Sequence, residues 1–495
     1  MTLLKRVGPK PWRSAAGAAA VSSSALCAVL WTLLVTASLP AQPNVLFIAV
    51  DDLNDWVGFL DGHPNTKTPN MDRLAARGVV FANAHCQAPI CGPSRASLMT
   101  GLLPSTTGIY GQISDRNIRK ASEPARNAVF LFEYFRDNGY KTMAVGKLFH
   151  SHVPEGTIDE SGGRARGFGP KTPKRVKWDR AKTSTDWAAF PERDEEMPDY
   201  ASAQWAAERL KQRHEKPFLL AVGFLRPHVP WYVPPKWFDK HPPGTLATPP
   251  YLPEDYDDLP EIAKRVAAVP MMPTADWAIE SGEWKNIVQA YLASVSFADH
   301  YVGQVLDALD ASPYADDTII VLWSDHGYHI GEKNRFAKHS LWEEATHAPL
   351  VFAGPGIEGG RTTRKAVGLV DIYPTLLDLA GLPANAANEG HSLRPLLDDA
   401  EAEWPHAALT TYGRNNHAVR TERYRYIRYE DGSEELYDHE SDDNEWSNVA
   451  GDPDYSAVKT KMRTHLPAVN APWSAVSPYD YNDYLSEAFR RHRVE

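Results

Sequence analysis

An eleven-residue stretch that begins at Cys91 has the residue types and spacing of a reactive centre. It reads C-x-P-S-R-x-x-x-x-T-G and ends at Gly101. A pattern with this many fixed positions arises by chance on the order of once in 10⁸ starting positions. Pro93 suits the first turn of a helix and Gly101 suits its end, so a short helix is predicted over 94–100. Cys91 would then lie at the helix N-terminus, where backbone N–H groups and the helix dipole favour an anion.

Polar side chains also follow four apolar segments that are predicted to be buried strands. The strands are expected over 44–50, 140–145, 217–224 and 318–324. The side chains that follow them are Asp51, Asp52, Lys147, His150, His228, Asp325 and His326. Because parallel strands end at one edge of a sheet, residues that are distant in the sequence can converge there.

The acidic pairs at these strand ends favour a metal site. Directly after a buried strand, Asp51-Asp52 is more consistent with metal ligation than with a solvated loop, and Asp325-His326 repeats the arrangement. Carboxylate oxygens suit a hard cation such as Ca²⁺ or Mg²⁺. Taken alone, His228 is more consistent with a packed histidine, and Lys338 with a solvated lysine, than either is with a catalytic role.

The Cys91 motif resembles the signature of type I sulfatases, in which this cysteine is oxidised after translation to Cα-formylglycine. Four other segments are similar to the iduronate-2-sulfatase branch of that family: GKLFH at 146–150, RPHVPW at 226–231, SDHG at 324–327 and AKHSLWEEATHAPLVF at 337–352. The resemblance extends over roughly residues 44–440. It implies an α/β fold of the alkaline-phosphatase type, with a mixed, mostly parallel sheet flanked by helices.

Two simpler interpretations of Cys91 compete with this one. It could be an ordinary buried thiol, or it could pair with Cys86, since exported proteins can keep disulfides. Pro93 and Arg95 at the family's spacing favour the modified residue.

The resemblance implies a divalent metal held by Asp51, Asp52, Asp325, His326 and an oxygen of the modified Cys91. Calcium is expected from the family, and magnesium is the second choice. His326 departs from the asparagine that many sulfatases carry there, although the iduronate-type branch shares it. Imidazole is an unusual ligand for calcium.

The resemblance also implies catalytic roles for Cys91, Arg95, Lys147, His150, His228 and Lys338. The aldehyde hydrates to a geminal diol; one hydroxyl attacks sulfur, and proton loss from the other then releases sulfate and restores the aldehyde. His150 would contact the diol and assist that second step. His228 and Lys338 would flank the leaving oxygen, while Lys147 and Arg95 would neutralise charge around the sulfate.

The sequence therefore predicts a sulfuric-ester hydrolase that acts on a sulfated carbohydrate, either a glycosaminoglycan or another sulfated polysaccharide or oligosaccharide. A formylglycine-generating enzyme is the expected maturation partner. Two alternatives stay open. One is a phosphonate or phosphate-ester hydrolase on the same fold, and the other is a sulfated-glycan-binding protein in which Cys91 stays a thiol.

The charge of the chain restricts its partners. A formal net charge of −11 argues against nucleic acid as a ligand. An acidic protein must build a local basic pocket to hold an anionic substrate, and Lys147, Arg95 and Lys338 are the candidates for it.

Residues 1–41 have the features of a signal peptide. A basic n-region precedes an apolar stretch of small residues over 15–39, and Leu-Pro-Ala stands before Gln42 as a cleavage site. The serine run at 22–24 disfavours a permanent membrane span, with an uncleaved anchor as the alternative. We expect an exported protein, periplasmic or extracellular, with no stable membrane span.

The remaining chain is predicted as two parts, a catalytic domain over 42–400 and an α+β subdomain over 401–495. In the first part we expect helices over 68–77, 129–136, 200–214, 283–309 and 371–379, strands over 79–81 and 349–353, a surface insertion over 155–199, and an irregular segment over 230–273. The second is expected to hold an antiparallel sheet with strands over 407–412, 418–420, 424–429 and 434–437, and a helix over 455–465.

Five further residues lie beside the motifs, where they either line a substrate pocket or pack in the interior. These are Trp231, Tyr232, Tyr328, His329 and Arg335.

Overall fold

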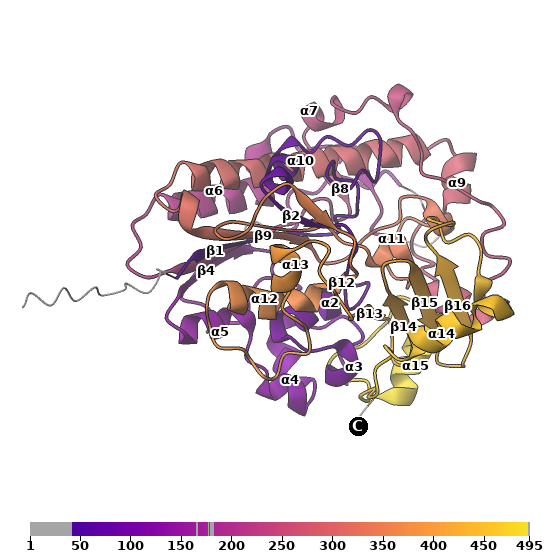
Figure 1. The fold of residues 1–495 in the computed structure, drawn as a ribbon. Coiled ribbons are helices and arrows are strands. Elements are labelled where there is room, and N and C mark those ends of the chain that lie inside the picture. Colours follow the sequence, from indigo (N-terminus) through magenta and orange to yellow (C-terminus); the bar gives the residue numbers. More distant parts are fainter. Residues whose placement is uncertain (1–41, 165–166, 177, 179–182, 494–495) are drawn as a thin grey trace, which may run out of the picture. The chain divides into compact units, whose positions relative to one another are not determined.

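An eight-stranded sheet forms the centre of the structure, with the strand order β11-β2-β10-β9-β1-β7-β4-β5 (Figure 1). The strands are β1 (Asn44–Val50), β2 (Gly78–Phe81), β4 (Lys141–Gly146), β5 (Glu160–Gly163), β7 (Phe218–Phe224), β9 (Thr318–Ser324), β10 (Leu350–Ala353) and β11 (Arg361–Thr363). Strand β10 runs antiparallel to both of its neighbours, and the other pairings in this sheet are parallel. The predicted mixed, mostly parallel sheet is confirmed.

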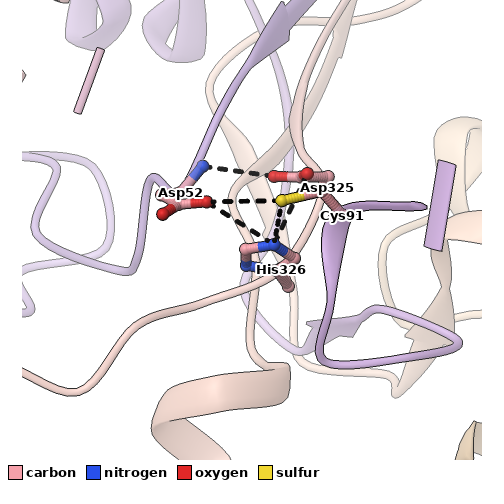
Figure 2. A group of neighbouring side chains, drawn as sticks. All are labelled: Asp52, Cys91, Asp325 and His326. Carbon is pink, nitrogen blue, oxygen red and sulfur yellow. Dashed lines mark hydrogen bonds and ion pairs between the residues drawn. The ribbon is translucent and has the colours of Figure 1, made fainter. Parts of the chain in front are cut away.

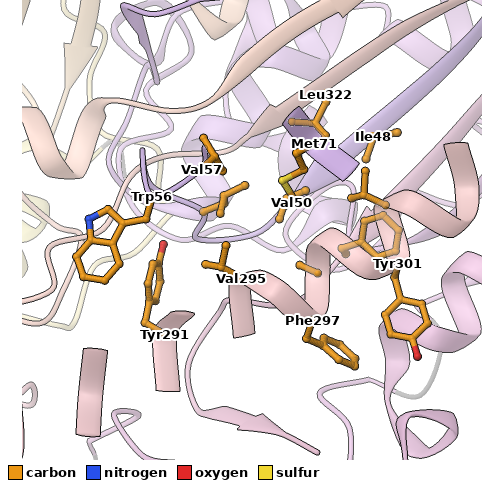
Figure 3. Packing of buried hydrophobic residues seen from close by; sticks show 14 of the residues in the cluster. Ile48, Val50, Trp56, Val57, Met71, Tyr291, Val295, Phe297, Tyr301 and Leu322 are labelled. Carbon is orange, nitrogen blue, oxygen red and sulfur yellow. The ribbon is translucent and has the colours of Figure 1, made fainter. Parts of the chain in front are cut away.

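The apolar runs of the central strands reflect burial on both faces of the sheet. In β1, Leu46, Ile48 and Val50 join one hydrophobic cluster, while the alternate residues join the other. Side chains alternate between the faces of a strand, so a strand covered on both sides needs apolar residues at every position. Figure 3 shows part of the first cluster, where Ile48 and Val50 lie near residues of β9, α1 and α10. Leu322 of β9 and Val295 of α10 are among them.

Helices cover the two faces of this sheet (Figure 1). One cluster contains residues of α1 (Pro69–Ala76), α6 (Pro198–Leu210) and α10 (Trp284–Asp310). The other contains residues of α2 (Cys91–Thr100), α5 (Leu131–Asp137), α12 (Ile372–Leu379) and α13 (Arg394–Asp398). Truncation of a fully buried leucine of α10, such as Leu306→Ala, is expected to cost about 2–5 kcal/mol.

Two segments contain more regular structure than expected. The segment 155–199, predicted as a surface insertion, supplies the edge strand β5 and also β6 (Trp187–Ala189). The segment predicted as irregular over 230–273 supplies β8 (Trp231–Val233), which pairs with β6, and α8 (Glu261–Ala267). The sequence of β5 is ESGG, which carries no apolar alternation, so nothing in its pattern indicated a strand.

Shorter elements complete the body. They are β3 (Ala84–His85), β12 (Val367–Gly368), α3 (Pro104–Thr107), α4 (Glu123–Asn127), α7 (Pro235–Phe238), α9 (Ala275–Glu280) and α11 (Glu343–Thr346).

An antiparallel four-stranded sheet near the C-terminus confirms the prediction made for that region. Its order is β13 (Ala408–Thr411), β14 (His417–Arg420), β15 (Tyr424–Arg428) and β16 (Glu434–Asp438), followed by α14 (Ser456–Arg463) and α15 (Asp483–His492). Residues of this sheet and of α15 share a hydrophobic cluster with Ile90, Tyr110 and Trp342 of the body. The exact boundary at residue 400 stays a prediction, because residues 42–495 form one compact unit.

The computed structural model describes residues 42–164, 167–176, 178 and 183–493. The predicted signal peptide over 1–41 lies outside the described residues. Among the helices within the described ranges, none combines the length and the apolar composition that crossing a bilayer requires.

Candidate active site

The carboxyl ends of three parallel strands bring the predicted site residues together. Asp51 follows β1 directly, and Asp325 follows β9 directly. Because Val50 and Ser324 are register partners in the sheet, these two aspartates start from neighbouring positions. On the other side of β1, β7 separates it from β4, whose end leads to Lys147. The expected convergence at this edge is what the topology produces.

Cys91 is the first residue of α2 and lies at the centre of this group. Its Sγ is 3.1 Å from Lys338 Nζ, 3.4 Å from His326 Nε2 and 3.8 Å from Asp52 Oδ1. Figure 2 shows the thiol between Asp52 and His326, with Asp325 beside them. Cys86 is a free buried thiol and makes no disulfide with Cys91. Burial raises the pKa of Cys86, which leaves that thiol unreactive.

The backbone at Asp52 adopts an unusual conformation that aims its carboxylate at Cys91. Its φ is 61°, in the left-handed region that side-chain-bearing residues seldom occupy. The Asp52 N–H donates to Asp325 Oδ1 at 3.2 Å, and the next N–H, of Leu53, donates to Ser324 Oγ at 3.0 Å. Residues held in such conformations concentrate at functional sites.

Three cations neutralise the three aspartates. Lys147 Nζ lies 2.5 Å from Asp51 Oδ2, and Lys338 Nζ lies 2.6 Å from Asp52 Oδ1. Arg95 bridges Asp51 and Asp325: its Nη2 lies 3.1 Å from Asp51 Oδ1, and its Nε lies 2.8 Å from Asp325 Oδ2. The predicted basic residues therefore do gather here, but each is paired with a carboxylate of the same site.

These pairs keep the buried carboxylates ionised. Burial alone would raise the pKa of Asp51, but the charges of Lys147, His228 and Arg95 outweigh it and hold the pKa well below its ordinary value. For Asp52, burial is likewise outweighed by His228 and Lys338, which lower the pKa to about 2. Both carboxylates are therefore ionised at any physiological pH.

Arg95 is fully buried and directs its donors at protein groups. Its Nη1 donates to the carbonyl oxygens of Lys147 and Leu148, both at 2.9 Å, in addition to its two carboxylate contacts. A guanidinium used in this way orients the aspartates and is not free to contact a ligand.

The two histidines nearest the aspartates each have a backbone carbonyl on Nδ1. His326 Nδ1 lies 2.9 Å from the Gly327 oxygen, and His228 Nδ1 lies 2.5 Å from the Val229 oxygen. A carbonyl only accepts, so Nδ1 of each ring carries a proton. Burial lowers the pKa of His326, so its ring is neutral and its Nε2 keeps a lone pair. His326 Nε2 points at Cys91, and His228 Nε2 lies 3.9 Å from Asp52 Oδ2. Metal-binding histidines typically show this arrangement.

His150 differs from these two because it approaches the site from the loop after β4. It is partly buried. Burial and the charge of Lys147 lower its pKa to about 3, so the ring is neutral and able to accept a proton.

The donor set fits a divalent cation. The ligand atoms of Asp52, Cys91, Asp325 and His326 lie within 4.8 Å of one another, and Asp51, Asp52 and His228 form a second such group. Asp52 Oδ2 is buried and has no hydrogen-bond partner. A buried carboxylate oxygen without a partner is costly, and a cation at this point would satisfy it.

Comparison with known proteins decides the family. The sulfatase family model matches residues 43–382, and the model of the N-sulphoglucosamine sulphohydrolase C-terminal region matches residues 331–471. The chain belongs to the sulfatase family. The enzyme is 52% identical over 465 residues to a sulfatase of Formosa agariphila, with 92% of each chain covered. It is 33% identical over 408 residues to Iduronate 2-sulfatase of Homo sapiens, with 72% of each chain covered.

Solved structures agree with this assignment. The fold matches that of a 2-O GAG sulfatase with a TM-score of 0.65 and 25% identity, over 86% of this chain and 90% of that one. The expected resemblance to sulfatases, and to the iduronate-type relative among them, is confirmed, as is the expected activity class, a sulfuric ester hydrolase.

The five residues beside the motifs prove to be interior residues of the enzyme. Trp231, Tyr232, Tyr328, His329 and Arg335 are all buried. Arg335 Nη2 donates to the carbonyl oxygens of Lys338 and His339 at 2.8 and 3.1 Å. Arg335 thereby supports the loop that carries Lys338.

Three residues beside the catalytic group were missed by sequence reasoning. The Phe168 ring lies 5.7 Å from that of His228, and the Arg164 guanidinium carbon lies 4.3 Å from the Phe168 centroid. On the other side, the Tyr481 ring lies 5.6 Å from that of His339, the neighbour of Lys338. Phe168 is 44% exposed and Tyr481 is 36% exposed. Arg164, Phe168 and Tyr481 all come from segments without a recognisable motif, so the sequence held no signal for them.

Proposed function

We propose that this sulfatase removes sulfate from a sulfated carbohydrate by means of a formylglycine formed at Cys91. The observation that carries the proposal is the position of the Cys91 side chain, within 3.1–3.8 Å of Lys338, His326 and Asp52 at the start of α2. That position gives one side chain contact with a cation, a neutral imidazole and an ionised carboxylate at once. Among the described residues, Cys86 is the other cysteine, and it lacks these neighbours.

The chemistry requires a residue that can both attack and release sulfate. The hydrated aldehyde of an oxidised Cys91 would place a hydroxyl nucleophile where the sulfur now lies, with a second hydroxyl on the same carbon. Lys338, at 3.1 Å from that position, would hold the negative charge of the sulfate close to the nucleophile.

The metal proposal rests on Asp51, Asp52, Asp325 and His326. When bound, Ca²⁺ would lower the pKa of the attacking hydroxyl and polarise a sulfate oxygen. Lys147 and Arg95 would keep these carboxylates ionised and fixed, whether or not substrate is present. Calcium is preferred to magnesium because the family implies it.

Two histidines would carry out the proton transfers. His228 Nδ1–H is committed to the Val229 carbonyl, so a proton delivered to the leaving alcohol oxygen would come from Nε2 of the protonated ring. His150 is neutral and would accept the proton of the second hydroxyl as the C–O bond to sulfate breaks. The bond that forms first joins oxygen to sulfur, and the bond that breaks joins sulfur to the sugar oxygen.

A carbohydrate substrate is supported by the rim of the site and by the relatives. The exposed ring of Phe168 lies beside His228, and that of Tyr481 lies beside His339, the neighbour of Lys338. Aromatic side chains commonly line ligand sites. The relatives include an iduronate 2-sulfatase and a 2-O GAG sulfatase.

Maturation and location belong to the same proposal. A formylglycine-generating enzyme would oxidise Cys91, and the signal peptide over 1–41 would direct export to the periplasm or the extracellular space. The division into a catalytic domain over 42–400 and a subdomain over 401–495 is proposed with it.

The test is sulfate release, measured by ion chromatography, from a panel of sulfated glycans and from an aryl sulfate. Cys91→Ala is expected to abolish release while Cys86→Ala retains it, and full activity of Cys91→Ala would refute the proposal. Faster hydrolysis of an aryl phosphate than of the aryl sulfate would instead favour the phosphate-ester alternative. Binding without turnover by protein whose residue 91 is the aldehyde would favour the glycan-binding alternative.

A further inference from the structure

A cation at the end of the edge strand β5 is not used by the catalytic group. Arg164 follows Gly163, which is the register partner of Val145 in the neighbouring strand β4. Since β4 and β5 are parallel, Arg164 leaves the sheet at the same edge as Lys147. The two residues line one small recess next to the site.

Within the described part of the chain, the Arg164 side chain donates one hydrogen bond. Its Nη1 donates to Ser151 Oγ at 3.3 Å, while its Nε is buried and has no hydrogen-bond partner. Among the described residues, no carboxylate forms an ion pair with the guanidinium. Asp115 is near enough to act on its charge, but the Asp115 oxygens accept the N–H groups of Ser151 and His152. Burial lowers the pKa of Arg164, as expected for a cation whose charge is incompletely compensated.

A row of contacts connects Arg164 to the catalytic aspartates. Its guanidinium carbon lies 4.3 Å from the Phe168 ring centroid, and that ring lies 5.7 Å from the ring of His228. His228 Nε2 is in turn 3.9 Å from Asp52 Oδ2. The charge of Asp51 also acts on Arg164. A ligand held at Cys91 would therefore have Arg164 on its flank, beyond His228.

The charge balance of the site indicates what Arg164 would bind. The three aspartates and the three cations of the catalytic group already pair with one another. Arg164 is an additional positive charge, and its planar fork of N–H donors matches an oxyanion. The ester sulfate itself would lie at Cys91 beside Lys338. Arg164 is thus free for a second anionic group of the same substrate.

We propose that Arg164 is a specificity-determining residue that binds a second oxyanion of the substrate, either a carboxylate or a second sulfate group. The substrate class is then an acidic sulfated glycan, in which the anion and the scissile sulfate lie on the same or adjacent sugar rings. Phe168 supports the guanidinium by stacking against it, an interaction that holds cations over aromatic rings. This inference rests on the proposed function and specifies its substrate.

The experiment compares Arg164→Ala with the parent enzyme on matched substrates. The probes are a 2-O-sulfated hexuronate–glucosamine disaccharide, with and without a second sulfate on the glucosamine, each as the native uronate and as its carboxyl-reduced form. 4-Methylumbelliferyl sulfate reports hydrolysis without a second anion. Arg175→Ala is the matched control, since Arg175 is an exposed arginine of the same segment that lies 5.7 Å from the Trp187 ring.

Arg164→Ala is expected to lower kcat/KM for the acidic disaccharide that the parent enzyme prefers. This loss should exceed the loss on the aryl sulfate by a factor on the order of 10 to 100. Arg164→Lys should recover part of that loss, because it restores the charge but not the planar fork. If the excess loss disappears on carboxyl reduction, the oxyanion is the carboxylate; if it disappears with the second sulfate, the oxyanion is that sulfate. Equal losses on all probes, or a loss of the same size in Arg175→Ala, would overturn the inference.

A binding measurement separates this inference from the proposed function. Calorimetric titration of the same disaccharides into Cys91→Ala protein reports affinity without turnover. A fall in affinity when Arg164→Ala is added to this protein supports the anion contact, even if the parent enzyme releases no sulfate. Absence of sulfate release would contradict only the proposed hydrolase function. Unchanged affinity for every acidic probe would overturn the anion contact.

Discussion

Lys338 Nζ lies 3.1 Å from Cys91 Sγ and is simultaneously ion-paired with Asp52 at 2.6 Å. One ammonium thus contacts both the residue that we propose is modified and a carboxylate of the proposed metal site. Burial alone would lower the pKa of Lys338, but the charges of Asp52, Asp51 and Asp325 raise it well above its ordinary value, so the side chain stays charged. From this relationship we expect Lys338 to stabilise the charge that develops on the sulfate.

Replacement of this lysine by an uncharged residue of similar length should therefore affect catalysis more than folding. Lys338→Met is expected to lower kcat for sulfate release by on the order of 10²- to 10³-fold, the usual effect of removing one preorganised charge contact. The control is Lys285→Met, at an exposed position of α10. Activity of Lys338→Met within a few-fold of the parent, in protein of unchanged melting temperature, would contradict the assigned role.

Removal of the metal should change stability as well as activity. Ca²⁺ that binds the folded protein alone stabilises it by about 2.7 kcal/mol at 100 times its Kd. We expect chelation with EDTA to lower the melting temperature and abolish sulfate release, and added Ca²⁺ to restore both. In Asp52→Asn, which removes one ionised ligand, the calcium-dependent rise in melting temperature should be smaller.

One outcome of that experiment would contradict the proposed metal site. A melting temperature of the parent protein that responds to neither Ca²⁺ nor Mg²⁺, measured by differential scanning fluorimetry after EDTA treatment, would show that the aspartate cluster holds no divalent cation.

The free energy of unfolding should depend on pH through Glu332, a buried carboxyl group away from the proposed site. Glu332 lines a cavity of about 990 Å³ together with Asp55 and Glu344. Burial and the charge of Asp55 raise the pKa of Glu332 to about 8. Between its ordinary value and pH 8, the folded protein keeps a proton on Glu332 that the unfolded chain has released. Because the folded state binds more protons in that window, the free energy of unfolding falls as the pH rises through it.

Glu332→Gln, which resembles the protonated acid, should therefore raise the melting temperature more at pH 8.5 than at pH 5. Its amide oxygen can still accept the hydrogen bond that Ile330 N donates to Glu332 Oε2 at 2.6 Å. The exposed Glu254→Gln is the control and should show no such difference. Equal gains at both pH values would mean that Glu332 is ionised in the folded protein across this range.

A buried contact with the C-terminal region fixes the backbone next to Lys338. His339 has a φ of 72°, and its Nδ1 lies 3.2 Å from the Tyr412 hydroxyl and 3.0 Å from that of Tyr479. The two hydroxyls also form a hydrogen bond with each other. Tyr479→Phe leaves buried partners unsatisfied and is expected to cost about 1–3 kcal/mol of unfolding free energy. Chemical denaturation measures this cost, and a change below about 0.5 kcal/mol would show that the contact contributes little.

The sequence was informative where a local pattern determines the structure. The apolar run of β1 followed by Asp51-Asp52, and the proline and glycine that bound α2 after Cys91, could be interpreted without knowledge of the rest of the chain. The convergence of these residues then followed from the rule that parallel strands end at one edge.

What could not be predicted depends on contacts between distant segments. Strand β5 is short and polar, so its place beside β4, and with it the position of Arg164, is visible only in the folded chain. Tyr481 reaches the site from the far end of the sequence. Arg95 was expected to neutralise charge around the sulfate, and its contacts with Asp51 and Asp325 could not be predicted from the sequence. The direction of β10, antiparallel to both neighbours, likewise had no local signature.

The most direct test of the central proposal is the mass of the peptide that contains residue 91. The enzyme would be produced with a formylglycine-generating enzyme and shown to release sulfate before digestion. The account predicts that active protein carries the aldehyde at Cys91, and that sulfate release rises in proportion to the modified fraction. Active protein whose residue 91 is entirely an unmodified thiol would contradict it.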